Sequence, residues 1–328
     1  MATILVTGGA GYVGSHACKA LARHGHLPVT YDNLSRGHAT AVKWGPLEIG
    51  DLEDRAHLDA VIRQWRPDGV LHFAAFAYVH ESMSDPGLYY RNNVGGTLSL
   101  LEAMRAADVR RLVFSSTCAT FGVPSVPLIG ETEPQAPINP YGASKLMVER
   151  ILRDQAAAHG LNAVIVRYFN AAGADPDGEI GEDHDPEPHA VPLAIAAAQG
   201  RGPVFRVLGA DYDTPDGSAV RDYVHVCDLA MAHVAALGHL TDGAQEGSAE
   251  AFNLGAGVGT SVLGLLAAVE RVGGRPVPAE RHARRPGDPP QLVADPTKAR
   301  TVLGWTPVMS DIDTIIATAW RWHSRSRL

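Results

Sequence analysis

A tyrosine and a lysine separated by one helical turn are the clearest candidates for acid–base chemistry. Tyr141 and Lys145 follow Asn139 and Pro140, which suit the N-cap and the first position of a helix. Residues at i and i+4 lie on one helical face, so the lysine ammonium is expected near the phenol. A free tyrosine has a pKa of about 10 and is a poor base at neutral pH. The positive charge of the lysine would lower that pKa and favour the phenolate. The pair is a candidate general base, although the same spacing also occurs on ordinary surface helices.

A second polar group precedes this helix, at the end of the apolar run 111–115. The chain continues there as Ser115-Ser116-Thr117. Ligands of open α/β sheets bind at the carboxyl ends of the strands, so Thr117 is placed to bind a substrate hydroxyl. Ser115 and Ser116 could contribute to the same site or simply cap the strand end. The sequence has no G-x-S-x-G turn, which disfavours a serine hydrolase.

A glycine-rich turn, residues 7–14, follows the first apolar run and opens a helical pattern. Its sequence is Thr-Gly-Gly-Ala-Gly-Tyr-Val-Gly. Gly8 and Gly11 allow a tight turn close to a pyrophosphate, and Gly14 allows close packing of helix on strand. The helix N-terminus then offers free N–H groups to the phosphates. The turn predicts dinucleotide binding, with Gly25 ending the helix.

An acidic residue at the end of the next apolar run specifies the dinucleotide. Asp32 follows Gly14 by 18 residues, close to the roughly 20-residue spacing of the acid that binds the adenosine ribose. A carboxylate there repels a 2′-phosphate, so we predict NAD rather than NADP, with Arg36 as the one nearby residue that disagrees. Asp51, followed by Leu52, could border the adenine or could cap the next helix.

Apolar runs alternate with helical patterns through the first half of the chain. Near-continuous apolar runs are typical of parallel strands buried on both faces. The predicted strands span 3–7, 28–32, 47–51, 69–73, 111–115 and 163–167, and the predicted helices span 11–24, 52–65, 92–107 and 140–159. We predict an α/β fold, a doubly wound parallel (Rossmann-type) sheet with a smaller C-terminal α/β substrate lobe. Residues 1–170 would form the NAD-binding domain and residues 171–328 the lobe, with a soft, discontinuous boundary.

Composition excludes several classes of protein. The net charge of −8 disfavours a nucleic-acid partner. Three cysteines without paired short spacing disfavour a disulfide scaffold. No apolar stretch approaches about 20 residues and no signal peptide is recognisable, so we expect a cytoplasmic protein without a membrane span. The histidines lack metal-ligand spacing and the acidic stretch 179–187 lacks calcium-loop spacing, so we expect no metal site.

These motifs together resemble the extended short-chain dehydrogenase/reductase family over nearly the whole chain. Further matching segments are Asp32-Asn33-Leu34, His72-Phe73-Ala74-Ala75, Asn92-Asn93-Val94, Arg167-Tyr168-Phe169-Asn170, and residues 221–226, 253–257 and 284–288. The resemblance implies that NAD contacts Gly8, Gly11, Tyr12, Val13, Gly14, Asp32, Asn33, Asp51, Leu52, Phe73, Ala74, Ala75, Asn92, Ser115, Tyr141, Lys145 and Tyr168.

The likeness is strongest to the branch of the family that 4-epimerises UDP-galactose and UDP-glucose. It implies that Tyr141 takes the proton of the sugar O4 with help from Thr117, while hydride passes to NAD and returns through a 4-keto-hexose. Lys145 would hold the nicotinamide ribose. Nucleotide-sugar 4,6-dehydratases carry an acidic pair after the threonine, whereas Cys118-Ala119 stand here. UDP-glucuronate and UDP-N-acetylhexosamine 4-epimerases remain alternatives, as do a net oxidoreductase and a non-catalytic NAD-binding scaffold or regulator.

The resemblance also assigns substrate binding and a homodimer interface. Substrate would contact Thr117, Tyr141, Asn170, His189, Ala190, Val207, Leu208, Arg221, Tyr223, Arg285 and Asp288. Arginine suits phosphate, but Arg284-Arg285 could be a surface turn and Arg221 could pair with Asp222. Ala77, Phe121, His189 and Leu208 depart from the family pattern and leave substrate breadth open. The dimer would pack helices 92–107 and 140–159, through Leu98, Leu101, Met104, Met147 and Ile151, which could equally face the sheet.

Overall fold

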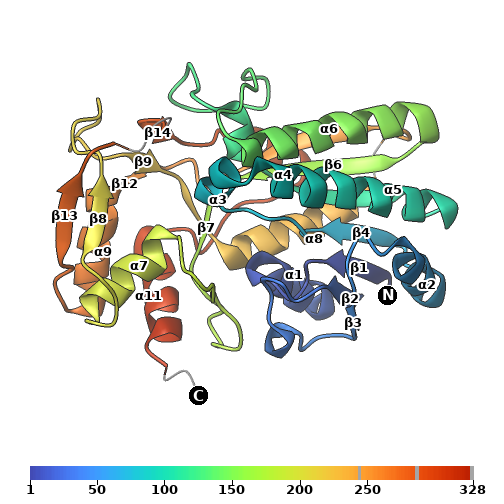
Figure 1. Ribbon diagram of the computed structural model, residues 1–328, viewed down its shortest axis with the longest axis horizontal. Helices are drawn as coiled ribbons and strands as arrows, with labels where there is room; N and C mark the ends of the chain where they lie inside the picture. The colour runs from blue at the N-terminus through green and yellow to red at the C-terminus, as the bar shows by residue number, and fades with distance from the viewer. Residues whose placement is uncertain (243–244, 285–287, 326–328) are drawn as a thin grey trace.

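A seven-stranded parallel sheet forms the centre of the larger part of the molecule (Figure 1). The computed structural model describes residues 1–242, 245–284 and 288–325. The strand order is β11-β6-β5-β4-β1-β2-β3. These strands are β1 (Thr3–Thr7), β2 (Leu27–Asp32), β3 (Leu47–Ile49), β4 (Gly69–His72), β5 (Arg111–Thr117), β6 (Asn162–Tyr168) and β11 (Ala249–Leu254). The predicted doubly wound sheet is therefore confirmed, and its edge strand β11 comes from the C-terminal half.

Helices cover both faces of this sheet. On one face, α2 (Arg55–Trp65), α5 (Gly96–Ala106) and α6 (Pro140–His159) bury their apolar residues in a common core with the strands. On the other face, α1 (Tyr12–Arg23), α8 (Val226–Asp242) and α10 (Thr297–Val302) do the same. The apolar strands are thus buried on both sides, which explains why they lack the alternation of a half-exposed sheet.

A smaller lobe lies beyond the carboxyl edge of the sheet, to the left in Figure 1. Its core joins α7 (Ala190–Ala198), α9 (Val262–Gly273) and α11 (Ile312–His323). Its strands are short and form three small sheets: β7 (Asn170–Ala172) with β10 (Tyr223–His225), β8 (Phe205–Leu208) with β13 (Ala279–His282), and β9 (Val220–Arg221) between β12 (Thr260–Ser261) and β14 (Gln291–Leu292). The remaining elements are α3 (Val79–Ser84), α4 (Pro86–Tyr89) and the short turns η1 (Ala39–Ala41) and η3 (Cys118–Phe121).

Helix ends follow the local chemistry of the sequence. The Asn139 side chain accepts a hydrogen bond from the Gly142 N–H at 2.8 Å, and Pro140 begins α6 as predicted. Gly25 follows α1 with φ +78°, as a glycine after a helix should. The helix α2 begins only at Arg55, because Asp54 and not Asp51 caps it.

The helix predicted over 92–107 is interrupted in its first part. Residues Tyr90–Gly95 form the π-helical turn η2, and regular α5 begins at Gly96. Within this turn the Asn93 amide donates to the Phe76 carbonyl and to Ser144 Oγ, both at 3.0 Å. π-Turns are frequent at functional sites, and this one fastens the chain to the loop after β4.

Candidate functional site

A cavity of about 730 Å³ opens between the carboxyl ends of the large sheet and the smaller lobe. Most of the site residues predicted from the sequence line it together. They are Gly8, Gly11, Tyr12, Val13, Gly14, Asp32, Asn33, Asp51, Leu52, Phe73, Ala74, Ala75, Asn92, Thr117, Tyr141, Tyr168, Asn170, His189, Ala190, Arg221 and Asp288. One cavity thus contains both the glycine turn and the tyrosine.

The glycine turn has the geometry of a phosphate cradle. Gly8 has φ +73°, and a Cβ there would lie 2.5 Å from the Ala74 nitrogen. A Cβ on Gly14 would lie 2.2 Å from the Gly8 carbonyl oxygen. Helix α1 begins at Tyr12 without any side-chain cap, so its first N–H groups are available to an anion. These residues therefore fit the pyrophosphate of a dinucleotide.

Adding one methyl group to the turn should remove cofactor binding. In Gly14→Ala the new Cβ would meet the Gly8 carbonyl, which is backbone and cannot move aside cheaply. We expect bound NAD to fall strongly and the unfolding free energy to drop by about 1–3 kcal/mol. NAD released by denaturation and the Tm measure both effects. The matched control is Gly95→Ala, where a Cβ meets nothing within 4 Å. A Gly14→Ala protein with full NAD content would contradict this prediction.

Asp32 is held with its carboxylate directed at the turn. It is 8% exposed and accepts hydrogen bonds from the Ala10 N–H at 3.0 Å and the Leu34 N–H at 2.8 Å. Burial raises its pKa, and the two N–H donors oppose that rise. Arg36, the residue that argued for NADP, forms an ion pair with Glu81 at 2.5 Å. Because Arg36 is paired with Glu81, its charge is less available to bind the 2′-phosphate of NADP. The pair therefore supports the preference for NAD.

Asp51 belongs to the cavity wall. It accepts from the Asn33 amide at 2.7 Å and from the Glu53 N–H at 2.9 Å. The alternative that Asp51 caps α2 is wrong, since Asp54 does so.

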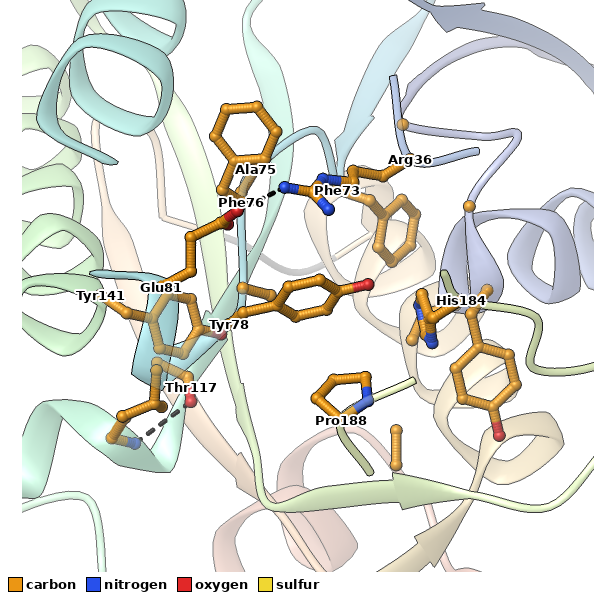
Figure 2. A pocket seen from close by; sticks show the side chains of 18 of the residues that line it. Arg36, Phe73, Ala75, Phe76, Tyr78, Glu81, Thr117, Tyr141, His184 and Pro188 are labelled. Carbon is orange, nitrogen blue, oxygen red and sulfur yellow. Dashed lines mark hydrogen bonds and ion pairs between the residues drawn. The ribbon is translucent and has the colours of Figure 1, made fainter. Parts of the chain in front are cut away.

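Tyr141 and Thr117 lie side by side on one wall of the cavity (Figure 2). Tyr141 comes from the first turn of α6 and Thr117 from the end of β5. Burial raises the Tyr141 pKa well above its usual value, and the neighbouring Thr117 hydroxyl opposes that rise. The phenol is therefore protonated in this state, and the geometry positions it beside a second hydroxyl.

Lys145 lies beneath the cavity wall rather than in it. Its ammonium donates to the Ser115 carbonyl at 2.7 Å and lies 4.8 Å from the centre of the Phe114 ring. Burial lowers its pKa to about 7, and the charge of Glu149 opposes that fall. Ser115 is also outside the lining, and its hydroxyl shares a 2.6 Å hydrogen bond with the Tyr168 hydroxyl. Ser116 donates to Glu149 at 2.7 Å, so neither serine is only a strand cap.

The small lobe contributes an arginine and an acid. The Arg221 guanidinium pairs with Asp288 at 2.5 Å on the cavity wall. The alternative pairing with Asp222 is wrong, because that carboxylate instead accepts the N–H groups of Ala256 and Gly257 at 2.8 and 3.0 Å. Val207, Leu208 and Tyr223 do not line the cavity, and the first and last of these are buried in the lobe core. Arg285 lies outside the described residues.

Sequence motifs missed several side chains of the cavity. Figure 2 shows Tyr78 between Tyr141 and His184, with Arg36 directed at Glu81. Arg36 also lies 5.1 Å from the centre of the Tyr78 ring. Tyr78 comes from the loop after β4, and His184 from the loop between β7 and α7. Loop residues that belong to no motif leave no periodic signal, so only the fold brings them together.

The fold, the glycine turn and the Tyr141–Thr117 pair define a dinucleotide-dependent enzyme, and comparison with known proteins specifies it. The family model described as "NAD dependent epimerase/dehydratase family" matches residues 4–255, and the chain belongs to that family. This confirms the family resemblance and the NAD expectation.

The similar proteins and solved structures share one name, UDP-glucose 4-epimerase. A UDP-glucose 4-epimerase of Rhizobium leguminosarum bv. trifolii is 55% identical over 325 residues, covering 99% of this chain and 98% of the relative. The crystal structure of UDP-glucose 4-epimerase from Brucella ovis in complex with NAD is 54% identical, with TM-score 0.95 and 98% of both chains covered. A Stenotrophomonas maltophila UDP-glucose-4-epimerase structure with bound NAD and formylated UDP-arabinopyranose has TM-score 0.95 at 38% identity, covering 99% of this chain and 98% of that one.

Proposed function

We propose that the protein interconverts UDP-galactose and UDP-glucose by NAD-dependent 4-epimerisation. The observation that carries the proposal is the placement of Tyr141 and Thr117 in the same cavity as the glycine turn and Asp32. Full-length relatives named UDP-glucose 4-epimerase support it.

Different residues of the chain would bind the cofactor, exchange the proton and orient the reacting hydroxyl. NAD, held by the glycine turn and Asp32, would accept hydride from the sugar and return it. Tyr141 exchanges a proton with the sugar O4, and Thr117 orients that hydroxyl through its own hydrogen bond. Lys145 donates from beneath the cavity wall to the Ser115 carbonyl, in the strand that ends at Thr117, and burial lowers its pKa to about 7. A side chain that is aligned before substrate binds needs little rearrangement during reaction.

The small lobe would hold the uridine diphosphate. Arg221 is oriented on the cavity wall by Asp288, and a guanidinium binds phosphate oxygens through two parallel hydrogen bonds. Asn170 and His189 line the same cavity. Holding the diphosphate while leaving the hexose loosely bound lets either face of the sugar meet the cofactor, which a 4-epimerisation requires.

The 4,6-dehydratase alternative lacks its acid and base. Cys118 occupies the position after Thr117, and burial raises the pKa of its thiol to about 12. Ala119 follows it. A neutral thiol and a methyl group cannot assist the loss of water.

A product analysis tests the function. The protein is incubated with UDP-galactose without added NAD or reductant, and the nucleotide sugars are separated by chromatography. We expect UDP-glucose as the only product, in equilibrium with the remaining UDP-galactose. A 4-keto-6-deoxy product would indicate a dehydratase, and no conversion a non-catalytic NAD-binding scaffold. In a separate incubation with added NAD, stoichiometric reduction of that NAD would indicate a net oxidoreductase. Parallel incubations with UDP-N-acetylglucosamine and UDP-glucuronate test substrate breadth.

We also propose a homodimer and a cytoplasmic location. Leu98 on α5 and Met147 on α6 are 39% and 47% exposed, whereas Leu101 and Met104 are buried in the home core. Two exposed apolar residues on adjoining helices favour the predicted interface, which light scattering would test. Cys18, Cys118 and Cys227 form no disulfide, as expected in a reducing compartment. Among residues 1–242, 245–284 and 288–325, no helix has the length and apolar character to cross a membrane.

A further inference from the structure

Four potential metal ligands converge in the loop between β7 and α7. Glu182, His184, Glu187 and His189 each direct one ligand atom toward a common point, and these atoms lie within 4.8 Å of one another. Glu182 is 3% exposed, whereas the other three are half-buried. The spacing E-x-H-x-x-E-x-H matches no standard metal motif, so the cluster could not be predicted from the sequence.

The separations suit a small tetrahedral cation. Glu182 Oε1 lies 3.4 Å from His184 Nδ1 and 2.7 Å from His189 Nδ1. Glu187 approaches the same two nitrogens at 3.6 and 2.9 Å. Zinc bonds of about 2.0–2.2 Å place tetrahedral ligand atoms about 3.3–3.6 Å apart. Two of these separations already match, and the other two need to widen by less than about 1 Å.

One ligand nitrogen lacks a hydrogen bond in the cluster. His184 Nδ1 is buried and has no hydrogen-bond partner, although it faces both carboxylates. Its two carboxylate partners lie at 3.4 and 3.6 Å, beyond good hydrogen-bond distance, and a bound cation would satisfy this buried nitrogen better.

We propose that Glu182, His184, Glu187 and His189 bind one Zn²⁺ ion per chain. Four protein ligands complete a tetrahedral shell and leave no open position, as in structural zinc sites. Glu182, His184 and His189 also line the cavity, so zinc would fix His189 in the cavity wall, whereas binding of zinc does not require the 4-epimerisation.

The ion would fix the loop against both parts of the molecule. The Trp322 indole of α11 donates to the Glu182 carbonyl at 2.9 Å. The rings of Tyr12, at the start of α1, and of Tyr78 pack edge-on against His184, with centroids 6.3 and 5.8 Å away. Zinc at this point would hold one wall of the cavity in place.

A neighbouring acidic group provides a contrast. Asp175, Asp177 and Glu179 also converge, but the Lys19 ammonium occupies their centre at 2.8, 2.9 and 2.6 Å. The Lys19 ammonium already pairs with all three carboxylates, so we expect this group to bind no zinc.

Metal analysis of the full-length protein tests the proposal. The chain is purified without chelators or a histidine tag, and its metal content is measured by mass spectrometry. We expect about one zinc per chain. His184→Ala and Glu187→Gln should each lower that content at least about tenfold, whereas Glu179→Gln, in the lysine-filled group, should retain it. Chelation should lower the Tm of the wild type, and added Zn²⁺ should restore it.

Co²⁺ binding by the wild-type protein tests the site without relying on the folding of any variant. Co²⁺ added to the chelated protein should give the intense visible absorption of a four-coordinate site, and Zn²⁺ should abolish it. A wild type without zinc and without saturable Co²⁺ binding would overturn the proposal. The cluster would then be a set of ion pairs, in which the carboxylates raise the pKa of His184 to about 9 and of His189 to about 10.

Discussion

Tyr141→Phe should lower the rate of UDP-galactose conversion by about 10²–10⁴-fold, the usual contribution of a positioned acid–base group. The change removes only the hydroxyl beside Thr117, and the ring keeps its edge-on contact with Tyr89 at 6.4 Å. Because the glycine turn and Asp32 are untouched, NAD content should stay at the wild-type level. The KM should change little, since the lost interaction acts on the proton transfer rather than on uridine diphosphate binding.

The matched control is Tyr168→Phe. Tyr168 lines the same cavity and is half-buried, and its hydroxyl shares a hydrogen bond with Ser115. We expect it to lose less than about tenfold in rate. Initial rates with UDP-galactose, together with released NAD, distinguish the two variants. Equal losses in both would mean that the cavity is merely disturbed, and an unchanged rate in Tyr141→Phe would remove the tyrosine from the mechanism.

Motifs at strand ends were predictable because one local rule fixes each of them. A glycine turn between strand and helix has one dominant use, and an asparagine–proline pair marks a helix start wherever it occurs. Gly14, Asn139 and Thr117 all lie where those rules place them. The properties of Lys145 were predictable only in part. Its position on α6 was predictable, but the burial that lowers its pKa to about 7 depends on β4, β5 and η2 packing around it.

Residues brought together by tertiary structure were not predictable. The Arg36–Glu81 pair joins segments 45 residues apart. Because Glu81 pairs with Arg36, this arginine no longer argues for NADP. The Arg221–Asp288 pair spans 67 residues. Neither partner carries a periodic or motif signal. Whether a charged residue is free to bind a ligand depends on its partner in space, which a single sequence does not reveal.

A buried ion pair behind the site should dominate the stability of this region. Arg167 and Glu149 are 2% and 0% exposed, and the guanidinium donates to both carboxylate oxygens at 2.9 and 2.6 Å. Ser116 donates to the same carboxylate at 2.7 Å. Arg167→Met would leave a buried carboxylate without its main partner, which costs about 3–5 kcal/mol. The Tm should fall by about 5 °C or more.

The control is another arginine on the same carboxylate. Arg153 reaches Glu149 at 3.2 Å, but its side chain is 39% exposed. Arg153→Met should cost less than about 1 kcal/mol, because water screens an exposed pair. A loss equal to that of Arg167→Met would contradict the role given to burial.

The same carboxylate links stability to pH and to the protonation of Lys145. Arg167 holds the Glu149 pKa below its usual 4.5 despite burial, so its stabilisation is present above about pH 4.5 and is lost as the pH falls through the lower folded pKa. In Glu149→Gln/Arg167→Met, urea unfolding should lack this acid-dependent loss. The charge of Glu149 also raises the pKa of Lys145 toward about 7. Glu149→Gln should therefore lower the lysine pKa further and shift the pH profile of kcat to lower pH. An unshifted profile would mean that Lys145 does not act through its charge.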